Sequence, residues 1–128
     1  MKNGIKYLIF ALLIAGVIGT SANAVNSFGF AGSAESGWAY VTNPSKNYLK
    51  DNGNGNFAVR WTYSNQSSHK MWFRLVNSDG ASRGSGCLSY LSTAAISTSA
   101  SKGYYYWLQA KREYIVDPST YVSGTWSL

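Results

Sequence analysis

The chain has 128 residues, which allows one domain and argues against several. It is 45% hydrophobic and 16% aromatic but only 12% charged, with 11 Lys and Arg against 5 Asp and Glu, a balance that excludes a highly charged disordered tail or a coiled coil. Its one cysteine excludes an intrachain disulfide and any cysteine-rich zinc or iron–sulfur site.

The first 24 residues carry the three parts of a secretory signal peptide. Met1–Lys6 holds two lysines, Tyr7–Ile18 is apolar, and Ala22-Asn23-Ala24 forms an A-x-A cleavage site. As a helix the apolar run would reach about 18 Å, too short for a hydrocarbon core of about 30 Å. We therefore predict a signal helix cleaved after Ala24 and a secreted, extracellular domain, Val25–Leu128, with no membrane span. Cleavage removes two basic residues and no acidic ones, which leaves a net charge of +4.

Period-two alternation of aromatic and β-branched residues indicates short strands along the rest of the chain. The strands that this pattern predicts are Gly37–Thr42, Asn56–Tyr63, Lys70–Val76, Gly103–Glu113 and Thr120–Ser127. Loops are expected where glycine, asparagine and serine gather, at Lys50–Asn56 and Asn77–Gly86. We favour two weak strands for the Ser/Thr-rich segment Cys87–Ser101, and either a flexible leader or an edge strand for Val25–Ser36.

About seven short strands with no long amphipathic helix predict an all-β fold, an antiparallel β-sandwich in one domain. Without a disulfide, its stability must come from aromatic burial. The alternation assigns these residues to the core: Phe57, Val59, Trp61, Met71, Phe73, Leu75, Tyr104, Tyr106 and Leu108. Tyr63 falls on the same face as Trp61.

Catalytic chemistry has few candidate residues in this sequence. The only histidine, His69, lies in a polar run and is expected to be an exposed turn residue. Three of the five carboxylates, Asp51, Asp79 and Asp117, lie in turn sequences where aspartate usually serves the backbone. We therefore predict no enzyme, no metal site and no cofactor. Cys87 is expected to be buried in preference to forming an intermolecular disulfide.

The same alternation leaves a face that mixes aromatic and basic residues. Its predicted members are Arg60, Trp72, Arg74, Tyr105, Trp107 and Lys111. Aromatic side chains stack on sugar rings or lie at membrane interfaces, and cations attract phosphates. The partners expected for this face are anionic polymers of the cell envelope or lipid head groups. The alternative is that other parts of the chain cover it and its cation–π pairs are structural. Nucleic acid is not expected, because the protein is exported and its basic residues are scattered.

Four segments carry a resemblance to known families: Ala58–Tyr63 (AVRWTY), Met71–Val76 (MWFRLV), Gly103–Ala110 (GYYYWLQA) and Tyr121–Trp126 (YVSGTW). Over residues 56–128 their order resembles a family of small secreted proteins of Gram-positive bacteria that share a domain of unknown function. The resemblance implies secretion and a β-rich fold and transfers no site. The chain is also similar to lactococcin-like secreted bacteriocins, which are cationic, aromatic β-sandwiches; in that group a tripeptide like Gly124-Thr125-Trp126 lies near the mature N-terminus.

Together these observations predict a secreted, non-catalytic binding protein that acts on bacterial cell envelopes and is bacteriocin-like. The alternative is a non-toxic glycan-binding or surface-structural module.

Overall fold

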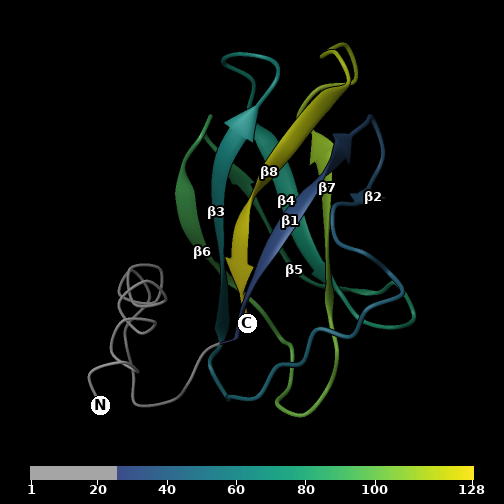
Figure 1. The fold of residues 1–128 in the computed structure, drawn as a ribbon, viewed down its shortest axis with the longest axis vertical. Coiled ribbons are helices and arrows are strands. Elements are labelled where there is room, and N and C mark those ends of the chain that lie inside the picture. Colours follow the sequence, from purple (N-terminus) through teal and green to yellow (C-terminus); the bar gives the residue numbers. More distant parts are fainter. Residues whose placement is uncertain (1–25) are drawn as a thin grey trace.

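The computed structural model describes residues 26–128, so the predicted signal helix and its cleavage site lie outside the described residues. Within that range eight strands form two antiparallel sheets of four strands each, which pack as the predicted all-β sandwich (Figure 1). The strands are β1 (Ser27–Ala34), β2 (Ala39–Tyr40), β3 (Asn56–Ser64), β4 (Met71–Val76), β5 (Ser82–Leu88), β6 (Thr93–Ser97), β7 (Trp107–Arg112) and β8 (Thr120–Ser127). No helix long and apolar enough to cross a membrane occurs among residues 26–128.

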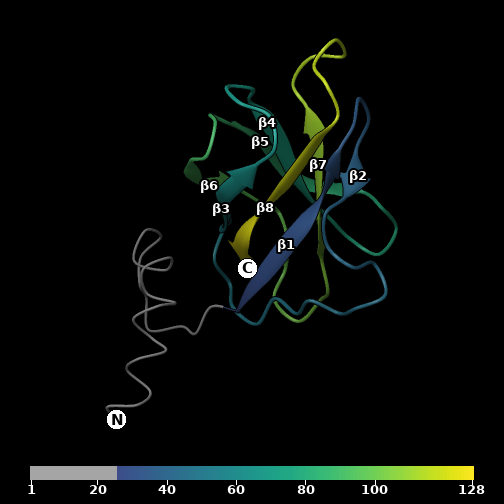
Figure 2. The same cartoon turned by 45° about the horizontal axis from the view of Figure 1, so that its top comes forward.

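The two layers are a sheet with the strand order β1-β8-β3-β6, here sheet A, and one with the order β2-β7-β4-β5, here sheet B. The β3–β4 and β7–β8 loops lie together at one end, the upper end in Figures 1 and 2. Segments 43–55 and 98–106 lie at the opposite, lower end (Figure 1). Each sheet has one face in the core and one outer face, and the outer faces lie on opposite sides of the molecule.

Aromatic rings from both sheets meet in the core. Phe73 of β4 lies 6.0 Å from Trp61 of β3 and 5.4 Å from Phe30 of β1, measured between ring centroids, with edge-on geometry in both pairs. Such pairs add about 0.5–1.5 kcal/mol to the burial of the rings. The predicted inward residues Phe57, Val59, Trp61, Met71, Phe73, Leu75, Tyr106 and Leu108 are all buried.

The predicted strand Gly103–Glu113 is too long. β7 begins at Trp107, because residues 104–106 pair with the chain at 48–50 instead of with a sheet strand. Tyr104 is therefore 64% exposed, and its predicted burial is wrong. Tyr63 also faces solvent, since the register of β3 against β8 shifts between Trp61 and Tyr63. A one-residue shift moves a side chain to the other face of a strand.

Two segments without a hydrophobic pattern prove to be strands. The predicted loop Asn77–Gly86 is wrong from Ser82 onward, where β5 begins; its Ser/Gly sequence gives no alternation signal. In the segment Cys87–Ser101 the structure has the end of β5 and then β6. Of the two alternatives for the N-terminal segment, β1 is the edge strand, paired with β8 along its whole length.

Candidate functional site

The outer face of sheet B brings together three of the six predicted site residues. Trp72 of β4 lies opposite Lys111 of β7, and Arg74 lies two residues further along the same strand, opposite Gln109. Their neighbours Phe73 and Leu75 are fully buried, so period two places Trp72, Arg74 and Lys111 on the outer face. All three are half-buried.

Trp38, which the sequence analysis did not select, lies at the centre of this group. The guanidinium carbon of Arg74 is 4.5 Å from the centroid of the Trp38 ring, and the ammonium nitrogen of Lys111 is 5.0 Å from it. Both separations fall within cation–π range. Backbone pairing of Glu35 with Lys111, an isolated parallel β-bridge, brings this stretch of chain beside β7. The alternation of Trp38 and Tyr40 in the predicted strand Gly37–Thr42 was a signal that could have found them.

The two cations of this cluster lack carboxylate partners. Arg74 donates from Nε to Oε1 of Gln109 at 2.8 Å, which fixes its orientation with a neutral acceptor. Burial lowers the pKa of Arg74, and Tyr40 partly offsets this. Among residues 26–128 the one contact between a basic side chain and a carboxylate within ion-pair distance joins His69 and Asp117 at the upper end. The Trp38 cluster (Trp38, Trp72, Arg74 and Lys111) therefore presents positive charge that is free to attract an anion.

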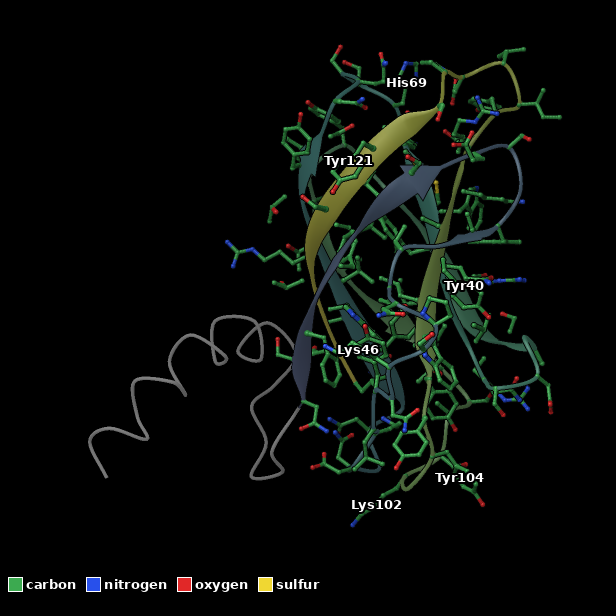
Figure 3. All side chains as sticks on the ribbon, turned by 45° about the vertical axis from the view of Figure 1, so that its right-hand side comes forward. Tyr40, Lys46, His69, Lys102, Tyr104 and Tyr121 are labelled. Atoms are coloured by element: carbon green, nitrogen blue, oxygen red, sulfur yellow. The ribbon has the colours of Figure 1, made fainter. Side chains whose placement is uncertain are left out.

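A groove begins where sheet B ends, toward the lower end of the sandwich. A hollow of about 450 Å³ lies between the β4–β5 turn and the segment before β7. Its lining residues are Asn77, Ser78, Asp79, Arg83, Ser99, Ser101, Tyr104, Tyr105, Tyr106 and Trp107. A second hollow of about 230 Å³ shares Asn77, Ser78 and Trp107 with the first and adds Tyr40 and Pro44. The two form one groove, with Tyr104 at the lower end and Tyr40 above it (Figure 3).

Backbone hydrogen bonds between two loops position the aromatic residues of this groove. The amide of Lys50 donates to the carbonyl of Tyr104, and the amide of Tyr106 donates to that of Tyr48, both at 3.0 Å. Across the groove, Oδ1 of Asn77 accepts from the amides of Asp79 and Ala81, which fixes the β4–β5 turn. The groove is thus held by backbone contacts and does not depend on a ligand to form.

Trp107 belongs to the groove but not to an exposed face. Its side chain is only 8% exposed, and the carbonyl of Lys46, in the loop after β2, accepts its indole N–H. The prediction of an exposed Trp107 is therefore wrong. Tyr105 is exposed as predicted, but it lies in the loop before β7 and lines the groove instead of a sheet face.

Arg60 does not belong to this site. It lies on β3 in sheet A, opposite Thr93 and Thr125, with its neighbours Val59 and Trp61 in the core. It is exposed on the other side of the molecule from Arg74, so its predicted place beside Trp72 and Lys111 is wrong. Alternation gives the face of a strand but not the sheet to which the strand belongs.

A buried lysine lies under the loops of the groove. Lys50 has no accessible surface, and its ammonium donates to Oδ1 of Asn52 at 3.1 Å. Asn52 in turn donates to the carbonyl of Leu128 at 2.8 Å and ties this loop to the C-terminus. Desolvation lowers the pKa of Lys50, and nearby Asp51 opposes the effect.

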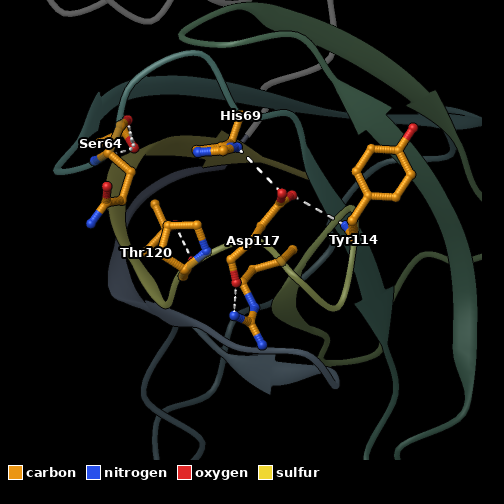
Figure 4. A network of polar contacts seen from close by, with 8 residues as sticks. Ser64, His69, Tyr114, Asp117 and Thr120 are labelled. Atoms are coloured by element: carbon orange, nitrogen blue, oxygen red, sulfur yellow. Dashed lines mark hydrogen bonds and ion pairs between the residues drawn. The ribbon is translucent and has the colours of Figure 1, made fainter.

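His69 lies in the loop between β3 and β4, as predicted, but its side chain is 34% exposed, which is less than expected, and it is paired. Its Nδ1 lies 3.4 Å from Oδ1 of Asp117, whose side chain is only 10% exposed (Figure 4). Ser64, at the end of β3, precedes the loop of this histidine, but its hydroxyl donates to the carbonyl of Gln66 at 2.7 Å and not to His69. The pair of His69 and Asp117 lies at the upper end of the sandwich, away from the groove. No cluster of three metal-ligating side chains occurs among residues 26–128.

Cys87 is exposed, and the prediction that it is buried is wrong. It lies on β5, the outermost strand of sheet B, opposite Trp72.

Comparisons with known proteins add no relative: no family model, no curated protein and no solved structure matches the chain.

Proposed function

We propose that the protein is a non-catalytic binding protein for anionic glycan polymers of the bacterial cell envelope, exported after cleavage of its signal peptide. The observation that carries the proposal is the aromatic groove that runs from Tyr104 to Tyr40 beside the unneutralised cations of the Trp38 cluster.

The groove suits a sugar chain. Tyr104 and Tyr105 present exposed rings on which the apolar face of a sugar can stack, and their hydroxyls can bond to sugar hydroxyls. Asn77, Asp79 and Arg83 add polar groups to the same lining. Aromatic walls with a few fixed polar groups are typical of small-molecule and oligomer sites.

The cations select for negative charge along that chain. Arg74 is held in place by Gln109, so its guanidinium is presented with little loss of side-chain freedom. Lys111 lies on the same Trp38 ring. A phosphodiester or carboxylate on a polymer in the groove could bond to either cation.

These features favour the glycan-binding alternative over bacteriocin-like action, because a groove with fixed walls serves recognition whether or not the target cell dies. Killing remains a separate prediction. It is tested by growth inhibition of a panel of Gram-positive strains with the purified protein, and absence of inhibition across the panel would count against it.

Retention on cell-wall sacculi, with and without their covalently attached anionic polymers, tests the binding proposal. We expect retention by the complete wall and about tenfold weaker binding for Tyr105→Ala and for Arg74→Gln. Tyr63→Ala and Arg60→Gln are matched controls, since they remove an exposed tyrosine and an exposed arginine from sheet A. Equal losses for Arg74→Gln and Arg60→Gln would show that only net charge matters, and the proposed site would be wrong.

A further inference from the structure

The tip of the β7–β8 loop exposes two aliphatic side chains at the upper end of the sandwich. Ile115 is 75% exposed and Val116 is 87% exposed, and Tyr114 beside them is 60% exposed. The amide of Asp117 donates to the carbonyl of Tyr114 at 3.0 Å, so Ile115 and Val116 occupy the two corner positions of a β-turn. Glycine, proline, asparagine, aspartate and serine usually occupy such corners. Nothing in the packing of the fold requires apolar side chains here.

Contacts of Asp117 at the base of the loop fix the conformation of this turn. Oδ2 of Asp117 accepts from the amide of Tyr114 at 3.2 Å, and Oδ1 of the same carboxylate pairs with His69 from the neighbouring loop. The guanidinium of Arg112 donates to the carbonyl of Asp117. Figure 4 shows these contacts converging on Asp117. A turn fixed in this way loses little conformational entropy when its tip enters another phase.

We propose that Ile115 and Val116 insert into the interfacial region of a lipid bilayer and orient the protein with its upper end on a membrane. The loop projects at that end in Figures 1 and 2. Two side chains on a convex turn are far below the area of roughly 1,000 Å² that a specific protein interface needs. A bilayer needs no matching pocket, and shallow insertion of a few apolar side chains is a recognised way to lie at its surface.

Exposed tyrosines at the upper end of the sandwich also favour contact with a lipid bilayer. Tyr63 and Tyr121, whose ring centroids are 6.3 Å apart, are exposed on sheet A. The amide of Tyr121 donates to Oδ1 of Asn65 in the β3–β4 loop, and Figure 3 shows Tyr121 in the upper half of the molecule, below His69. With Tyr114 they supply three exposed phenol groups. Tyrosine is enriched at the head-group level of membranes because its ring is apolar and its hydroxyl is wet.

The charges around the base of the loop nearly balance. The residues concerned are Lys70, His69, Arg112, Glu35, Glu113 and Asp117. Insertion of the tip should therefore depend on apolar transfer and not on salt. This distinguishes the loop tip from the Trp38 cluster, and the inference does not rest on the proposed glycan binding.

The test is co-sedimentation of the purified chain from Val25 onward, which contains every strand and the whole described core. The vesicles are pure phosphatidylcholine in one arm and phosphatidylglycerol mixed with phosphatidylethanolamine in the other, with no glycan present. We expect binding to both, with binding to phosphatidylcholine unchanged between low and high salt.

The double variant Ile115→Ser/Val116→Ser should lower the partition coefficient by about tenfold or more, because two aliphatic side chains no longer enter the bilayer. Val116→Trp should raise it. Leu49→Ser, which removes an exposed leucine near the lower end, is the control and should change nothing. An unchanged partition of the double variant, an equal loss for Leu49→Ser, or no binding of the unaltered protein would each overturn the proposal. A change of oligomeric state in the double variant without vesicle binding would instead assign the tip to a second copy of the chain.

Discussion

The indole nitrogen of Trp107 donates a 2.7 Å hydrogen bond to the backbone carbonyl of Lys46, across 61 residues of sequence. The bond joins the first residue of β7 to the loop after β2 and closes that loop over the ring. A side chain on the outer side of a sheet is thus buried against a loop and counts among the buried hydrophobic residues of the fold. The wall of the groove depends on it, because Trp107 lines both of its hollows.

Replacement of Trp107 should therefore affect stability strongly. We expect Trp107→Ala to lower the free energy of unfolding by about 3–5 kcal/mol, and Trp107→Phe by about 1–2 kcal/mol through loss of the hydrogen bond and some volume. Urea denaturation measures both. Trp38→Ala, at a half-buried ring beside Arg74 and Lys111 of the same sheet, is the control and should cost clearly less. A small effect of Trp107→Ala would mean that the loop does not cover the ring.

Gly124 lies where the fold leaves no room for a side chain, a requirement that the sequence alone does not explain. A Cβ at this position would overlap the carbonyl oxygen of Arg60 and lie 2.9 Å from the ring of Phe30. The closest approach falls where the register of β3 against β8 is about to shift. We expect Gly124→Ala to lower the free energy of unfolding by about 2–3 kcal/mol. Gly29→Ala on neighbouring β1 is the matched control, because its added Cβ would meet only the Gly124 carbonyl, at 3.9 Å.

Alternation predicted the fold well wherever a strand has one apolar face. The inward side chains of two strands were assigned correctly, because large apolar groups have no place except between the sheets: Phe57, Val59, Trp61, Met71, Phe73 and Leu75. It failed at Ser82–Gly86, where small residues carry no hydrophobic signal and pairing with β4 makes the strand. It also failed at Tyr104, where pairing with a distant loop overrides the pattern.

The site was less predictable for a related reason. Trp72, Arg74 and Lys111 could be grouped because paired strands bring them together, and their alternation was visible. Arg60 followed the same alternation on a strand of the other sheet. Sheet membership is decided by long-range pairing, which local sequence does not encode. The contact between His69 and Asp117 joins two loops across 48 residues and had no local signal at all.

Cys87 offers a prediction about reactivity. The thiol is exposed, but partial desolvation and the neighbouring Glu113 raise its pKa, while Lys70 lowers it. Because the thiolate is the reactive form, we expect one alkylatable thiol in the native protein, with a pH midpoint above the ordinary 9.0. Glu113→Gln should lower the midpoint and Lys70→Gln should raise it, as measured by iodoacetamide rates against pH. Shifts in the same direction for both variants would contradict this account.

Lys50 gives a stability that depends on pH. Desolvation lowers its pKa in the fold below the ordinary 10.5, so between those two values the unfolded chain binds more protons than the native one. The free energy of unfolding should therefore rise with pH through that window as the buried ammonium loses its proton. At neutral pH the buried charge is a cost to the fold, because its one side-chain acceptor is an amide oxygen of Asn52.

Lys50→Met isolates this contribution. Methionine has a similar length and no charge, and Oδ1 of Asn52 keeps its bond from the amide of Asn54 at 2.9 Å. Relative to the unaltered protein, we expect the variant to gain stability at neutral pH and to lose that gain as the pH approaches 10.5. Urea denaturation at a series of pH values measures the difference, and Lys102→Met in the adjacent loop controls for the loss of one positive charge. A difference between Lys50→Met and the unaltered protein that stays constant over this range would show that Lys50 keeps an ordinary pKa in the fold, because only a shifted proton equilibrium makes the difference vary with pH.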